Sequence, residues 1–200
     1  MQGWSDAPLS QVGEAQAERA GRALASAGVK PGLVGSSDLL RARRTAELLA
    51  AETGYEATPL VDPALREQDL GNWNGLSRAE IKQRWPSELA KRDLGGIGDV
   101  PGGETGPAFA ERCLGALERF AATLFEAGEE AGEEVAVTVT HGGVVIALEH
   151  ALGCWQAGVG HPNLSGWWLD VIGPGGLGDM VVRERVELKD AGVENATRSL

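Results

Sequence analysis

The stretch Val135–Val145, read VAVTVTHGGVV, constrains the fold of this chain more than any other part of it. An apolar run rich in β-branched residues stops at His141 and two glycines, where a helix can begin. A strand that runs directly into a helix is the building unit of α/β layered domains with parallel sheets. Such domains bind ligands at the carboxyl ends of their strands, so His141 falls where chemistry is expected.

The rest of the chain alternates helical and strand patterns in the same way. The spacing of apolar residues predicts helices over Ser10–Gly28 and Asp38–Thr53, with a short strand Leu33–Ser36 between them. The later predicted elements are a strand near Thr58–Val61, a short helix Ser77–Trp85 halted by Pro86, a loop Gly95–Gly106, a long helix from Thr105, a helix Val144–Leu152, and strands Ser165–Ile172 and Met180–Leu188. We therefore predict an α/β fold, a three-layer α/β/α sandwich with a mostly parallel sheet, in one domain spanning residues 1–200.

Charge and cysteine usage limit the classes of partner. The chain has 18 basic and 29 acidic residues, a net charge of −11, which argues against nucleic acid or an anionic membrane as partner. No apolar run approaches the roughly 18–20 residues that cross a membrane, and we expect a cytoplasmic protein. Cys113 and Cys154 lack metal-type spacing and are expected to be reduced thiols. The sequence predicts no metal site and no cofactor.

The segment SSDLLRARRTA, residues 36–46, places Arg41 in the first turn of a helix that follows a strand. Free N–H groups at a helix start favour anions, and a guanidinium beside them adds a forked set of donors that fits phosphate. The alternative interpretation is a solvated helix face, and we expect Arg43 and Arg44 to follow it.

The segment LREQDLGNWNG, residues 65–75, places Glu67 in a loop lined by glycine and tryptophan. A carboxylate that is partly removed from water there would have a raised pKa, which suits proton transfer near neutral pH. Taken alone, Glu67 is better explained as a surface carboxylate, and Trp73 is better explained as a packing residue than as a platform for the substrate.

The His141-Gly142-Gly143 junction offers an imidazole donor and a backbone that a ligand can approach closely. The segment Pro101–Thr105 is explained by Thr105 as the N-cap of the long helix. His150 lies about 13 Å further along its helix than His141, too far to share one phosphate. Nothing around His161 resembles a metal site.

Taken together, the motifs SSDLLRARRTAELL, LREQDLGNWNG, PGGET and VTVTHGGVVIALEHALG resemble the histidine phosphatase superfamily, the phosphoglycerate mutase-like proteins. The opening MQGWSDAPLSQVGEAQA is similar to the segment that follows this family's first catalytic loop. Within the family, the block at residues 65–77 and the tail HPNLSGWWLDVIG look most like actinobacterial phosphatases of the glucosyl-3-phosphoglycerate and broad-specificity type.

The resemblance implies hydrolysis of a phosphate monoester of a small metabolite, without a metal, through a phosphohistidine intermediate. Arg41 would hold the phosphoryl oxygens, and Glu67 would protonate the leaving alkoxide. His141 would hydrogen-bond the equatorial oxygens, with the Gly142 N–H beside it. The expected partner is a small phosphorylated metabolite, and a homodimer stays open because an apolar late strand such as Gly166–Ile172 can pair between subunits.

One family motif is absent from the sequence. The Arg-His-Gly-Glu/Gln-Thr motif supplies the nucleophilic histidine at the end of the family's first strand, and these 200 residues do not contain it. We expect the chain to be an N-terminally truncated reading of a complete phosphatase. Two alternatives stand beside this expectation: a pseudoenzyme that binds phosphate without cleaving it, and a mutase, which the short segment between Glu67 and Pro101 disfavours.

Overall fold

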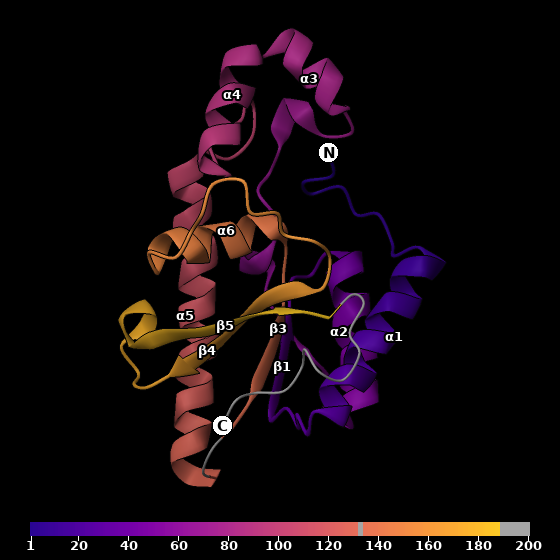
Figure 1. Ribbon diagram of the computed structural model, residues 1–200, viewed down its shortest axis with the longest axis vertical. Helices are drawn as coiled ribbons and strands as arrows, with labels where there is room; N and C mark the ends of the chain where they lie inside the picture. Colours follow the sequence, from indigo (N-terminus) through magenta and orange to yellow (C-terminus); the bar gives the residue numbers. More distant parts are fainter. Residues whose placement is uncertain (132–133, 189–200) are drawn as a thin grey trace.

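The computed structural model describes residues 1–131 and 134–188, and it has a layered α/β architecture (Figure 1). Three parallel strands form the central sheet in the order β2-β1-β3. Their bounds are Leu33–Ser36 for β1, Leu60–Val61 for β2 and Ala136–Val139 for β3. Because the carboxyl ends of parallel strands lie at the same end of a sheet, the segments after Ser36 and Val139 begin side by side.

Helices cover both faces of this sheet. Figure 1 shows α1 (Gln11–Ser26) and α2 (Leu40–Thr53) on one side of β1 and β3, with α5 (Gly106–Ala131) on the other. The helix α6 (Gly142–Ala151) packs on α5 through Val144 and Ala147, which contact the buried Phe109 and Cys113. The predicted sandwich with a parallel sheet is therefore confirmed.

The ends of the first two helices follow local sequence signals. The Ser10 side chain accepts a hydrogen bond from Gly13 N and caps α1, as predicted. The helix α2 ends at Gly54, which has a φ of 74° that glycine adopts without strain. The N-cap residue of α2, Leu39, makes no capping hydrogen bond with its side chain. Instead, the Asp6 carboxylate accepts a hydrogen bond from Leu40 N at 2.7 Å.

A small cap lies beyond the carboxyl ends of the strands and contains α3 (Arg78–Arg84), α4 (Pro86–Gly95) and the short turn η2 (Gly71–Trp73). Pro86 ends the first helix, as predicted, but it also occupies the first turn of α4, a helix that we did not predict. Trp73 is fully buried and packs with Ile81 and Leu89. Its predicted role in packing is confirmed.

The last two strands form a separate sheet. The strands β4 (Ser165–Val171) and β5 (Met180–Glu187) pair in an antiparallel hairpin, connected through the short turn η3 (Gly176–Asp179). Among the described residues, β3 pairs only with β1, and β4 pairs only with β5. Each therefore has one edge without a strand partner, which leaves the carbonyl and N–H groups of that edge without ladder bonds.

The long helix α5 approaches the sheet closely at Gly35. A Cβ atom at this position would lie 2.2 Å from the Phe120 ring, so the contact requires glycine. Phe109 and Cys113 are fully buried, as their helical spacing predicted. Further along α5, Leu117 and Phe120 instead face a cavity beside β3. In the part of the chain that the structure describes, no helix is both long and apolar enough to span a bilayer.

Candidate functional site

The site lies where β1 and β3 end and their helices begin. Arg41 is in the first turn of α2, which follows β1, and His141 is the N-cap residue of α6, which follows β3. Glu67 comes from the loop after the short turn η1 (Pro63–Leu65), and the Thr140 hydroxyl holds that loop by donating to Leu65 O at 3.0 Å. Arg41, Glu67, His141 and Gly142 line one cavity, so the structure brings the predicted site residues together.

His141 is largely removed from water. Its residue surface is 9% exposed, and its Nε2 atom is buried without a hydrogen-bond partner among the described residues. Burial, together with the nearby charge of Arg41, lowers the pKa of His141 to about 3. The imidazole is therefore neutral near pH 7, with an unpaired nitrogen facing the site.

The Glu67 carboxylate lies against the start of α6. Its Oε2 accepts a hydrogen bond from Gly143 N at 3.1 Å, and its Oε1 accepts one from Gln68 N at 2.8 Å. A Cβ atom at position 143 would lie 2.1 Å from Glu67 Oε1. The second glycine of the motif thus makes room for this carboxylate, which explains why position 143 is a glycine.

The Arg41 guanidinium is held by the first residues of the chain. Its Nη1 donates to Ser5 O at 2.8 Å, and its Nη2 donates to Gly3 O at 2.9 Å. Burial lowers the pKa of Arg41, while the charges of Glu67 and Asp6 oppose this shift. Sequence reasoning found Arg41 but missed these contacts, because they connect residues more than thirty positions apart.

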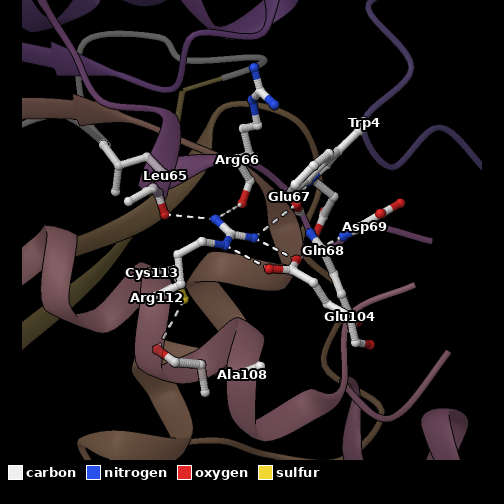
Figure 2. A network of polar contacts seen from close by, with 12 residues as sticks. Trp4, Leu65, Arg66, Glu67, Gln68, Asp69, Glu104, Ala108, Arg112 and Cys113 are labelled. Atoms are coloured by element: carbon white, nitrogen blue, oxygen red, sulfur yellow. Dashed lines mark hydrogen bonds and ion pairs between the residues drawn. The ribbon is translucent and has the colours of Figure 1, made fainter. Parts of the chain in front are cut away.

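A second arginine fixes the loop that carries Glu67 (Figure 2). Arg112 on α5 makes a forked ion pair with Glu104, with Nε and Nη2 each 2.7 Å from a carboxylate oxygen. Its Nη1 and Nη2 also donate to the backbone carbonyls of Ala64, Arg66 and Glu67, at 2.8 to 3.3 Å. This anchor is a structural device that the sequence reasoning did not find.

The segment Pro101–Thr105 has the structural role predicted for it. Thr105 Oγ1 accepts a hydrogen bond from Ala108 N at 3.3 Å in the first turn of α5. Its neighbour Glu104 is engaged by Arg112 and also accepts from Asp69 N at 2.9 Å. These bonds lower the pKa of Glu104 against the opposing effect of burial. The carboxylate is therefore committed to holding the loop.

Trp4 also contacts the loop that carries Glu67, from its solvent side. Its indole Nε1 donates to Glu67 O at 2.7 Å, and the Arg66 guanidinium lies 5.0 Å from its ring centroid (Figure 2). Arg66 is in turn paired with Asp38, and this ion pair lowers the pKa of that carboxyl. Glu67 is thus supported through its backbone by groups from several elements.

The cavity extends well beyond the site. It has a volume of about 1050 Å³ and follows β3 from Val135 to His141, with β4 on its opposite side. Leu24 and Leu49 line it from the helices on one face of the sheet, and Leu117 and Phe120 line it from α5 on the other face. It is therefore an apolar slot that opens between the free edges of β3 and β4 and ends at the site.

The other two histidines are held by different contacts, although His161 also lines the cavity. His150 stacks on Trp155 with ring centroids 4.5 Å apart and bonds Gly95 O, while His161 bonds both carboxylate oxygens of Glu149 at 2.9 Å. Arg44 pairs with Glu14 on the surface, as expected for a solvated helix face. Within the described ranges, no three His, Cys, Asp or Glu residues are grouped as a metal site.

Comparison with known proteins identifies the family. Residues 1–166 match the model of the histidine phosphatase superfamily, branch 1. The chain therefore belongs to this superfamily, as its motifs indicated.

Among its relatives, glucosyl-3-phosphoglycerate phosphatase of Mycolicibacterium vanbaalenii is 32% identical over 98% of this chain and 89% of its own length. A 2,3-bisphosphoglycerate-dependent phosphoglycerate mutase of Methylocella silvestris is 44% identical over 52% of this chain, and the match spans about half of the mutase, 51%. A solved complex of a mycobacterial glucosyl-3-phosphoglycerate phosphatase with inorganic phosphate is 31% identical, with a TM-score of 0.76, over 96% of this chain and 93% of that chain.

Proposed function

We propose that this protein hydrolyses phosphate monoesters of a small metabolite, without a metal, through a phosphohistidine intermediate. One observation supports this more than any other: Arg41, Glu67 and His141 meet in one cavity, and His141 offers a buried nitrogen that no described residue satisfies. Phosphoryl transfer depends mainly on positioning and on donors around the transferring oxygens, which is what this arrangement can supply.

Three groups bind the phosphoryl oxygens in this proposal. The Arg41 guanidinium carries fixed positive charge beside the start of α2. His141 donates from its ring, and the Gly142 N–H at the first position of α6 has no intrahelical acceptor. These donors surround the equatorial oxygens and stabilise the charge that spreads over them in the transition state.

Glu67 moves the proton in both half-reactions. In the first, a histidine nitrogen attacks phosphorus, the ester P–O bond breaks, and the Glu67 carboxyl gives its proton to the leaving alkoxide. In the second, Glu67 accepts a proton from water, the hydroxide attacks phosphorus, and the P–N bond breaks to release phosphate. The hydrogen bond from Gly143 N to the Glu67 carboxylate keeps it beside the reacting oxygen.

The attacking histidine is proposed to arrive on a strand seated in the slot between β3 and β4. Both neighbouring edges lack a strand partner in the described chain, and both faces of the slot are apolar. A central strand of a parallel sheet has these surroundings. If it ran parallel to β3, its carboxyl end would reach the site where the resemblance requires the Arg-His-Gly loop.

The test compares the 200-residue chain with a form extended at its N-terminus by an apolar strand and an Arg-His-Gly-Glu-Thr loop. We expect the extended form to hydrolyse p-nitrophenyl phosphate and to trap acid-labile phosphate on its added histidine. The matched control changes that histidine to alanine, and Glu67→Gln should remove most of the turnover. An extended form that folds but neither turns over nor traps phosphate would refute the proposal, as would isomerisation of 3-phosphoglycerate without phosphate release.

A second function is favoured by the positions of the other histidines. His150 bonds Gly95 O, and His161, which lines the cavity, bonds the Glu149 carboxylate, so the Nε2 atom of each ring is already engaged. The 200-residue chain by itself is therefore proposed to bind phosphate without cleaving its esters. Its turnover should match that of a His141→Ala variant, and brisk hydrolysis by the unextended chain would disprove this.

A further inference from the structure

The first residues of the chain bring a carboxylate to the start of α2. Asp6 lies on the surface, and its Oδ1 accepts a hydrogen bond from Leu40 N at 2.7 Å. Leu40 is the first residue of the helix, and Arg41 is the second. In the described parts of the chain, no cation lies within ion-pair distance of Asp6, because the nearby Arg66 pairs with Asp38 instead. The negative charge of Asp6 is therefore held by a backbone amide.

The start of α2 is already supplied with acceptors from inside the protein. Its N-cap residue, Leu39, has no capping side chain, but the Leu39 N–H donates to Ser37 Oγ at 3.3 Å. The next N–H, that of Leu40, donates to Asp6. The first turn of α2 contains no acidic residue, so Asp6 provides from a distant segment the negative charge that stabilises a helix start. Asp6 thus takes a position that would suit an anionic ligand.

The same segment holds the arginine of the phosphate site. Residues 3–6 supply two carbonyl acceptors for the Arg41 guanidinium, and they supply the carboxylate at the helix start. The negative charges of Glu67 and Asp6 both act on Arg41 and oppose the lowering of its pKa by burial. Because like charges repel, a phosphate dianion bound at Arg41 meets an unfavourable electrostatic contribution from Asp6.

The segment that carries Asp6 is anchored on the cap. Gly3 is buried with a φ of 45°, and a Cβ atom there would lie 2.4 Å from Asn74 Oδ1. In addition, Gly75 N donates a hydrogen bond to Met1 O at 3.0 Å. These contacts oppose a movement of the carboxylate away from the site when an anion binds. The repulsion is therefore built into the site before a ligand arrives.

We propose that Asp6 is an internal competitor of phosphate: its carboxylate occupies the start of α2 and weakens the binding of a phosphate dianion at Arg41 and His141. This inference rests on the proposed function and adds a residue that sets the affinity of the same site. Inorganic phosphate is the product of the proposed hydrolysis, so weaker phosphate binding favours product release. Asp6 acts through its charge and through α2, as a positioning residue.

Calorimetric titration of the 200-residue chain with inorganic phosphate at pH 7.5 tests the inference without requiring turnover. Asp6→Asn keeps an oxygen that accepts from Leu40 N but removes the charge. We expect this variant to bind phosphate about tenfold more tightly than the wild type at low ionic strength, the effect of one nearby charge at a protein surface. At about 0.5 M salt the gain should shrink to about threefold or less, because salt screens an exposed charge.

Matched variants separate this effect from a change in the fold. Asp6→Ser is a second neutral residue that caps a helix start, and it should also tighten binding if Asp6→Asn does not fold. Glu14→Gln removes one exposed negative charge that pairs with Arg44, and it should bind phosphate within about twofold of the wild type. Arg41→Gln should weaken binding, because it removes a phosphate contact. A variant that only loosened the structure would weaken phosphate binding rather than tighten it.

Unchanged or weaker phosphate binding in the neutral variants of Asp6 would overturn the inference. An equal gain in Glu14→Gln would also overturn it, because the gain would then come from net charge. If no form of the chain binds phosphate, the phosphate site itself fails and this inference fails with it. If the wild type binds phosphate and Arg41→Gln weakens that binding, the phosphate site stands, and the neutral variants alone decide the role of Asp6.

Discussion

The buried, unpaired imidazole of His141 predicts a specific loss of stability in mild acid. Its pKa is about 3 in the folded protein, whereas an unfolded histidine titrates near pH 6.5. Between these values the unfolded state binds a proton that the folded state does not, so lowering the pH favours unfolding. The destabilisation begins as the pH falls through about 6.5 and stops growing below about 3.

The magnitude follows from the same two pKa values. At pH 5.0, about 1.5 pH units below the unfolded pKa, keeping His141 neutral costs about 2 kcal/mol of unfolding free energy. At pH 7.5 the cost is close to zero. In a domain with roughly 5–15 kcal/mol of stability, a change of this size is readily measured.

Urea denaturation of the wild-type chain and of His141→Gln, each at pH 7.5 and pH 5.0, isolates this effect. Other titrating groups contribute nearly equally to both proteins, so the variant should lose about 2 kcal/mol less than the wild type between the two pH values. Equal losses would refute the reasoning, because they would mean that His141 titrates in the folded protein as it does in water.

Three further predictions follow from contacts around the site. Binding of inorganic phosphate at pH 6 should be accompanied by proton uptake, because an anion beside His141 raises the pKa of its imidazole. Calorimetry in buffers of different ionisation enthalpy measures the uptake, and the same binding heat in every buffer would contradict the prediction. Gly143→Ala should destabilise the fold by about 1–3 kcal/mol, since its Cβ would lie 2.1 Å from Glu67 Oε1. The control Gly142→Ala places its Cβ in open space and should leave stability unchanged, so equal urea midpoints for the two variants would disprove this. Arg112→Met should lower the free energy of unfolding by about 2–4 kcal/mol, because it leaves the Glu104 carboxylate without its ion-pair partner. Arg119→Met, whose arginine side chain is 62% exposed, should lower it by less than about 1 kcal/mol, and similar losses in thermal melting would argue against the role of Arg112 as an anchor.

Much of the site was predictable because its residues lie at junctions that the sequence marks. The change from a strand pattern to a helix pattern after Ser36 and at His141 placed Arg41 and His141 at the same end of a parallel sheet. Glu67 was harder to place, since its loop has no periodicity. The family motif identified it, and the bond from Gly143 N explains its position.

The helix α4 and its arginine show where sequence reasoning stopped. Pro86 is a valid signal for the end of a helix and equally for the start of one, and local pattern does not choose between them. The burial of Leu89 against Trp73 decides the choice here, because it gives the second helix an apolar face to pack. Arg92, a residue of α4 that lines the cavity, reaches it only because this second helix forms.

The sequence by itself determined the layered fold, the Ser10 cap of α1 and the identity of the groups at the strand ends, because each depends on neighbours close in the chain. Only the tertiary structure decided what surrounds those groups. The low pKa of His141, the Arg112 anchor and the slot beside β3 all come from residues distant in sequence. Their energies depend on burial and on the paths of separate segments, which no local pattern encodes.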